Sequence, residues 1–321
     1  MLDAITERVL VLGDFVVGLG YVFAPLYLVT SLAIAAGIWL VSRRGGSLLA
    51  YLFPRETYRH ASVKVDLRLT GLNTVLVGLG GLSFAVMTPT VASALASLWG
   101  SAPAASPAHL PAATGIVLAL ILFLIDDFCR FALHITHHKV PALWPFHEVH
   151  HSAEVLTPLS YFRAHPVYFF VQRMLITACS GLLQAAVAVA AFGWIDAWVF
   201  YAAGIPSIVY MLAGVHLRHS HIPVRYGRLA EMVLISPYLH QLHHSIDPRH
   251  RDVNFGEVLS IWDRLFGTLF RLDTTEPLTF GLTDDEGNRV QPYPDLTAAL
   301  FVPFRKSARA LIPLEKRVEH G

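Results

Sequence analysis

Histidine is the residue type in this sequence with the clearest capacity for chemistry. The chain contains 17 histidines, and 14 of them lie between His134 and His250. Imidazole is the commonest metal ligand among protein side chains. The clustering therefore indicates a metal site, for which we identify ten candidate ligands: His134, His138, His147, His150, His151, His216, His219, His240, His243 and His244.

The spacing of these histidines suits helices that present ligands to two ions. His134 and His138 are four residues apart, so on a helix they share a face. The pattern His-x-x-His-His occurs twice, at residues 147–151 and 240–244. On a helix its two adjacent histidines point about 100° apart and can reach different ions, while the first histidine supports one of them.

A further histidine group lies at residues 216–221. His216 and His219 are three residues apart, and each could add a ligand to one of two ions. His221 is a reserve candidate. Ten imidazoles are too many for one tetrahedral ion and suit two, although imidazole binds zinc, copper, iron and nickel alike.

Three polar residues are candidates for orienting the ligands. A metal-bound imidazole usually donates its second N–H to a carboxylate or a carbonyl. Asp127 precedes His134 by two helical turns, so it lies on the same face, and an acid inside an apolar run is costly unless it has a role. Asp252 and Asn254 follow the last histidine cluster after a short loop and could hold its histidines.

The elements that position these ligands are predicted to be membrane helices. The chain is 54% hydrophobic and 15% charged, with a mean hydropathy of +0.51, whereas soluble domains carry about 25% charged residues. A helix needs about 20 apolar residues to cross the hydrocarbon core. Long apolar runs occur at about Phe15–Val41, Leu69–Leu98, Ala112–Leu133, Val167–Phe192 and Trp194–Val215.

Basic residues predict the orientation of these helices, because cytoplasmic loops carry an excess of Lys and Arg. Residues 42–68 hold five Arg and one Lys, whereas residues 101–111 hold none. We therefore expect a multi-pass, all-α integral membrane protein with about four to five transmembrane helices. A cytoplasmic helical cap would hold the histidine-rich dimetal site. The acidic opening of the chain does not predict a cleavable signal peptide.

The sequence divides into three expected regions. Residues 1–111 form N-terminal membrane helices and a basic cytoplasmic loop. Residues 112–272 form the catalytic domain with all the candidate ligands. Residues 273–321 form a C-terminal cytoplasmic tail that is rich in turn residues.

An ordered set of motifs resembles the fatty acid hydroxylase/sterol desaturase superfamily. It covers about residues 127–270, nearly half of the chain. Its motifs are Asp127-Phe128, His134-x3-His138, Leu143-Trp144-x-Phe146-His147-x2-His150-His151-Ser152, Arg163-x-His165-Pro166, His219-Ser220, Pro237-x2-His240-x2-His243-His244-Ser245, Asp252-x-Asn254-Phe255-Gly256 and Trp262-Asp263-Arg264-Leu265-Phe266-Gly267-Thr268.

The resemblance implies a membrane di-iron site that faces the cytoplasm, with the matching histidines as iron ligands. It implies hydroxylation of a lipid with O2, or desaturation by the same site, and we favour hydroxylation. Zinc lacks the redox chemistry for such reactions. The sequence contains no fused haem-binding reductase domain, so we expect a separate electron donor of the cytochrome b5, ferredoxin or reductase type.

Other classes of protein remain as alternatives. Residues 147–151 also read as His-Glu-x-x-His, the zinc-binding motif of metalloproteases in which the glutamate, here Glu148, is the general base. The second pattern has Gln241 at that position, which disfavours a protease. A metal transporter would hold its ligands near the bilayer midplane. A bis-histidine haem protein would not require the His-x-x-His-His pattern twice.

Overall fold

The chain folds mainly into α-helices. The computed structural model describes residues 25–42, 45–78, 88–100, 111–193 and 195–312. Within these ranges the only sheet is a hairpin of β1, Leu282–Thr283, and β2, Arg289–Val290, in which Leu282 pairs with Val290.

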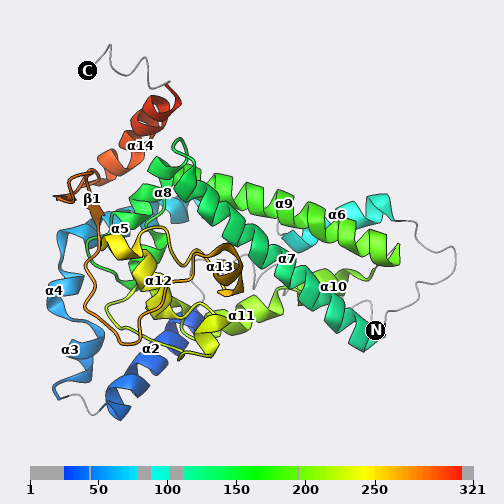
Figure 1. The fold of residues 1–321 in the computed structure, drawn as a ribbon, viewed down its shortest axis with the longest axis horizontal. Coiled ribbons are helices and arrows are strands. Elements are labelled where there is room, and N and C mark those ends of the chain that lie inside the picture. The colour runs from blue at the N-terminus through cyan, green and yellow to red at the C-terminus, as the bar shows by residue number, and fades with distance from the viewer. Residues whose placement is uncertain (1–24, 43–44, 79–87, 101–110, 194, 313–321) are drawn as a thin grey trace.

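Three helices form the largest hydrophobic layer. Helices α7, Ala112–Lys139, and α9, Pro166–Phe192, run side by side, and α6, Thr88–Trp99, packs along α9 (Figure 1). The α6–α9 contact is close because Gly181 has no side chain: a Cβ there would lie 2.9 Å from Cγ1 of Val91. Small residues let membrane helices approach in this way.

The N-terminal part differs from the predicted apolar runs. The described part of the first run is α2, Pro25–Val41, and its earlier residues lie outside the described ones. In the second run the structure describes the end of α5, Ala61–Gly78, and then α6, and residues 79–87 lie outside the described ones. Two short helices, α3, Leu48–Leu52, and α4, Arg55–Tyr58, come between α2 and α5 in the chain.

The predicted fifth helix is broken into shorter pieces. They are α10, Ala197–Ala202, α11, Ile205–Leu212, and the 3-10 helix η2, Val215–His219. Pro206 has no N–H to donate to the carbonyl of Ala202, four residues earlier, which interrupts the helix after α10. Gly214 has a φ of +99°, which ends α11 and turns the chain into η2.

Short elements carry most of the remaining histidines. Helix α8, Trp144–His151, follows α7 directly, and α12, Pro237–His243, is capped by the Ser236 side chain, which accepts a hydrogen bond from Leu239 N. The other short elements are η1, Pro158–Phe162, η3, Ala230–Met232, η4, Pro248–His250, and α13, Ile261–Phe266.

The C-terminal segment packs onto the histidine-bearing part of the fold. Helix α14, Leu296–Leu311, lies against α8, and Tyr293 just before it is fully buried. The predicted tail therefore includes an ordered helix of 16 residues that packs on the rest of the fold. Residues 313–321 lie outside the described ones.

One helix of the described chain, α9, is both long and apolar enough by itself to cross a membrane. Helix α2 and the α10–α11 segment are apolar but shorter. Large apolar side chains are exposed along α7 and α9, for example Ile116, Leu120 and Leu182. These exposed side chains form a surface that is unusually apolar for contact with water.

Candidate dimetal site

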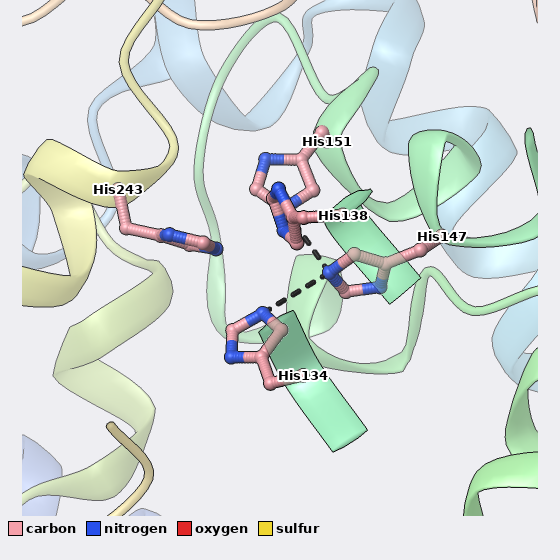
Figure 2. Close-up of side chains that lie close together, drawn as sticks. All are labelled: His134, His138, His147, His151 and His243. Atoms are coloured by element: carbon pink, nitrogen blue, oxygen red, sulfur yellow. Dashed lines mark hydrogen bonds between the residues drawn. The ribbon is translucent and has the colours of Figure 1, made fainter. Parts of the chain in front are cut away.

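Five histidines converge from three helices. His134 and His138 come from α7, His147 and His151 from α8, and His243 from α12, and their rings point toward one another (Figure 2). One nitrogen from each ring lies within 4.8 Å of the others. The Nε2 atom of His147 is 3.1 Å from that of His134 and 3.2 Å from that of His151. We call these residues the five-histidine group.

Four more histidines converge beside them. His150 comes from α8, His219 from η2, and His240 and His244 from α12 and its C-cap, again with one nitrogen each within 4.8 Å of the others. The Nε2 atom of His219 lies 3.1 Å from that of His240 and 3.1 Å from that of His244. We call these residues the four-histidine group.

Helix geometry divides each His-x-x-His-His pattern between the two groups. In α8, His147 and His151 are four residues apart and share a face, whereas His150 points to the four-histidine group. Helix α12 divides in the same way, with His243 in one group and its neighbour His244 in the other. The groups are adjacent, since the rings of His151 and His244 stack with centroids 4.4 Å apart.

Backbone carbonyls orient several of the rings. The Nδ1 atoms of His134 and His243 lie 2.8 and 2.7 Å from the carbonyl oxygens of Phe255 and Val253. A carbonyl only accepts, so each Nδ1 carries the proton and each Nε2 keeps a free lone pair. His150 is held in the same manner by the carbonyl of Arg163, at 3.3 Å.

The resulting arrangement fits metal ions. Two bare lone pairs at Nε2 atoms 3.1 Å apart repel each other, so a proton or a cation must lie between them, and several second nitrogens of these rings have no partner among the described residues. Burial lowers the pKa of His147 and His243 well below the ordinary value, and neighbouring imidazoles lower it further. The imidazoles are therefore neutral at pH 7, the form that binds metals.

His216 and His221 lie outside both groups. His216 is buried against the rings of Tyr161 and Phe162. A 3-10 helix rises about 2 Å per residue, so in η2 His216 sits roughly 6 Å from the level of His219. His221 Nε2 instead bonds the carbonyl of Tyr51, at 2.7 Å. The expectation that His216 adds a ligand finds no support in this placement.

Asp127 supports the site indirectly. It is buried, and it accepts hydrogen bonds from the backbone N–H groups of Val258 and Leu259 and from Nε1 of Trp262, at 2.9–3.1 Å. No described histidine donates to it. Asp127 thus joins α7 to the loop before α13, rather than orienting a ring as we expected.

Asp252 and Asn254 shape the loop that carries the orienting carbonyls. Both have positive φ, +58° and +55°, which Asp and Asn adopt more readily than most residues. The Asn254 side chain bridges the backbone of Leu239, in α12, and of Phe270. Asp252 lies 3.6 Å from Nδ1 of His138 and pairs with Lys139 at 2.6 Å.

Two supporting acids were not predicted from the sequence. Asp263 is fully buried and accepts from the N–H groups of Phe255 and Gly256, both at 2.8 Å, so it fixes the loop whose carbonyl orients His134. Asp66, on α5, pairs with the fully buried Arg163 at 2.7 Å. An isolated acid between Val65 and Leu67 was the available sequence signal for Asp66.

Glu148 does not face the histidine groups. Its carboxylate accepts from Tyr293 Oη at 2.6 Å and from Lys306 Nζ at 2.7 and 2.8 Å, both in the C-terminal segment. A metalloprotease requires this glutamate beside the metal-bound water. The geometry therefore disfavours the protease alternative.

A cavity of about 160 Å³ lies against both groups. His134 and His147 of one group and His150, His219 and His240 of the other line it. Its other walls are largely apolar, for example Ile176 from α9 and Met211 from α11, and they include the Arg218–Glu257 ion pair, 3.2 Å long. A small apolar group bound there would lie directly beside the histidines.

Known lipid hydroxylases and monooxygenases are similar in sequence to this chain. The family model described as fatty acid hydroxylase matches residues 119–268. An ornithine lipid hydroxylase from Rhizobium tropici is 30% identical over 71% of this chain and 61% of its own length. The human alkylglycerol monooxygenase is 29% identical over 50% and 32%, and the rat cholesterol 25-hydroxylase is 30% identical over 53% and 53%. No solved structure shows a significant match.

Proposed function

We propose that the chain belongs to the fatty acid hydroxylase family, whose model matches residues 119–268, and that it is a membrane-bound di-iron oxygenase that hydroxylates a lipid. The observation that carries the proposal is the pair of adjacent histidine groups opening onto one cavity. The chain spans 61% of the Rhizobium relative and about a third of the human one. Activity, substrate and electron donor are therefore inferred from the site and from this kinship.

Each histidine group would hold one iron ion. When bound, the iron pair supplies the one-electron and O2 chemistry that side chains lack. The overall reaction converts R–H, O2, two electrons and two protons into R–OH and H2O. The electrons come from a separate donor of the cytochrome b5, ferredoxin or reductase type.

The protein's own residues orient and shield the reacting groups. The carbonyls of Phe255, Val253 and Arg163 hold three rings with their Nε2 lone pairs directed inward. The apolar cavity walls at Ile176 and Met211 bind the hydrocarbon part of the lipid and exclude water. Water exclusion matters because it prevents side reactions of reactive oxygen intermediates.

We further propose that the chain is a multi-pass membrane protein with this site on the cytoplasmic side. The exposed apolar side chains along α7 and α9 support contact with lipid. The basic residues at 42–68, with none at 101–111, support this orientation. The helices α9 and α11, which contribute Ile176 and Met211 to the cavity wall, would then lie beside the lipid of the bilayer.

The test begins with the metal content of the full-length protein purified in detergent. We expect about two irons per chain in the wild type, and about one after either His147→Ala or His240→Ala. His250→Ala is the matched control, because His250 is buried but belongs to neither group. Lipid extracts are then supplied with reductant and ¹⁸O2.

Incorporation of one labelled oxygen atom into a lipid, lost in His147→Ala and kept in His250→Ala, would establish the proposal. A single zinc per chain, together with peptide cleavage that Glu148→Ala abolishes, would refute it in favour of a protease.

A further inference from the structure

Glu257 places a carboxylate on the cavity wall beside the dimetal site. Its neighbour Gly256 is held by Asp263 at 2.8 Å, and the next residue back, Phe255, orients His134. A Cβ at Gly256 would lie 2.4 Å from the carbonyl oxygen of Leu259. The backbone is therefore tightly fixed on either side of the point from which Glu257 extends.

One oxygen of the Glu257 carboxylate is paired and the other is not. Oε2 pairs with Arg218 at 3.2 Å, while Oε1 has no partner within the described part of the chain. The side chain retains 31% of its exposure and lines the cavity. Arg218 itself is 3% exposed, and its guanidinium also donates to the carbonyls of Gly256 and Glu257.

The unpaired Oε1 atom of Glu257 can accept a hydrogen bond from a bound ligand. Burial alone would raise the pKa of Glu257, but the adjacent Arg218 outweighs it and lowers the pKa, so the carboxylate is ionised. An ionised carboxylate only accepts hydrogen bonds. The hydrocarbon part of a lipid has no donor, whereas a hydroxyl or an ammonium at its polar end does.

We propose that Glu257 selects and positions the substrate by binding a hydroxyl or ammonium group at the polar end of the lipid. Given the proposed oxygenase function, the carbon that is oxidised then lies within a few bonds of that polar group. The remainder of the lipid chain runs along the apolar wall formed by Ile176, Met211 and Val215.

Two arginines on the cavity wall offer an alternative way of selecting the lipid. Arg130 and Arg173 also line it, and Arg130 is paired with Asp126 at 2.7 Å. If these arginines controlled selection, a carboxylate-ended lipid would bind best and Glu257 would only repel it. The experiment therefore includes such a lipid.

The experiment measures lipid binding rather than turnover. Four lipids of one chain length, ending in an alcohol, an amine, a methyl ether or a carboxylate, compete with a dye-labelled lipid for the full-length, iron-loaded protein in detergent. Because a hydrogen bond to a charged group is among the stronger ones, we expect the alcohol and the amine to bind roughly tenfold tighter than the ether.

Three variants make the result specific to Glu257. Glu257→Gln should abolish most of the preference for the amine and less of that for the alcohol, since an amide oxygen still accepts. Glu257→Asp should keep part of both preferences. Glu276→Gln, which alters a surface partner of Arg249, should change neither. Bound metal and monodispersity are measured for each variant.

Equal binding of the alcohol and the ether by the wild type would overturn the proposal, whatever the variants do. Tightest binding of the carboxylate-ended lipid, or an unchanged preference in metal-replete Glu257→Gln, would also overturn it. Failure of the oxygenase function is a separate result: lipids would bind in the Glu257-dependent order, but no ¹⁸O would enter them.

Discussion

The histidines of this site depend on backbone carbonyls more than on acids for their orientation. His134 and His243 both donate from Nδ1 to carbonyls of the segment 253–255. The conformation of that segment therefore sets the direction of two Nε2 lone pairs. Asp263 controls it, since it accepts from two consecutive backbone N–H groups and from Thr268 Oγ1.

This dependence predicts the effect of Asp263→Asn. An asparagine side chain has one oxygen that accepts and one NH2 group that only donates. One of the two backbone N–H groups that Asp263 binds would therefore lose its acceptor, at a cost of about 1–3 kcal/mol. We expect a lower thermal midpoint and a lower iron affinity, by about 10- to 100-fold. Thermal unfolding and metal titration measure the two effects. Asp285→Asn, at an exposed position in the β-hairpin, serves as the control and should match the wild type.

A comparison of two neighbouring histidines tests the ligand set. His219 lies in the four-histidine group and His216 does not. We expect His219→Ala to lose about one of the two irons and His216→Ala to keep both. The iron content of each purified variant is measured. An equal loss of iron in the two variants would show that His216 is also a ligand.

Local sequence spacing explains how the histidines converge, but it does not identify the residues that support them. The His-x-x-His-His patterns fix side-chain directions within one helix, so the division of α8 and α12 between two groups follows from local geometry. Asp263 and Glu257 act through contacts that form only after distant segments pack. Such residues have no recognisable spacing in the sequence. Asp127 was expected to orient a histidine ring, whereas its carboxylate binds the backbone of Val258 and Leu259.

At the scale of elements, the C-terminal helix is joined to the dimetal site through α8. The Glu148 carboxylate on α8 points away from the histidine groups and is held by Tyr293 and Lys306. The turn-rich composition of residues 273–295 gave no indication of this contact. The break between α10 and α11 was likewise missed, because an apolar run reads as continuous although Pro206 divides it.

The Glu148–Lys306 contact can be tested with a double-mutant cycle. Lys306→Met leaves the buried carboxylate without its cation, and we expect a loss on the order of 1–2 kcal/mol, less than for a fully buried pair. Adding Glu148→Gln removes the unpaired charge and should recover much of the loss. Thermal midpoints of the two single variants and of the double variant measure the coupling. Additive losses would show that the pair contributes little.

At the scale of the whole molecule, the dimetal site connects parts of the chain that are distant in sequence. Its ligands come from α7, α8, η2 and α12, and the loops that orient them are anchored to α5 by Arg163–Asp66 and to α7 by Asp127. The helices α6, α7 and α9 pack against one another through a separate cluster of buried apolar side chains. The only candidate ligands that these three helices carry are His134 and His138, at the end of α7. Metal binding should therefore stabilise one part of the fold selectively.

Removal of the metals tests this division. Without cations, nine converging imidazoles lose their common partners, whereas an ion present at 100 times its Kd contributes about 2.7 kcal/mol. We expect chelation to accelerate amide hydrogen exchange in α8, in α12 and in the last turn of α7, and to leave the α6–α9 contact unchanged. Zinc should restore this protection without restoring ¹⁸O incorporation, because it has no redox chemistry, whereas iron should restore both. Faster exchange throughout the molecule would instead show that the apolar layer also depends on the metals.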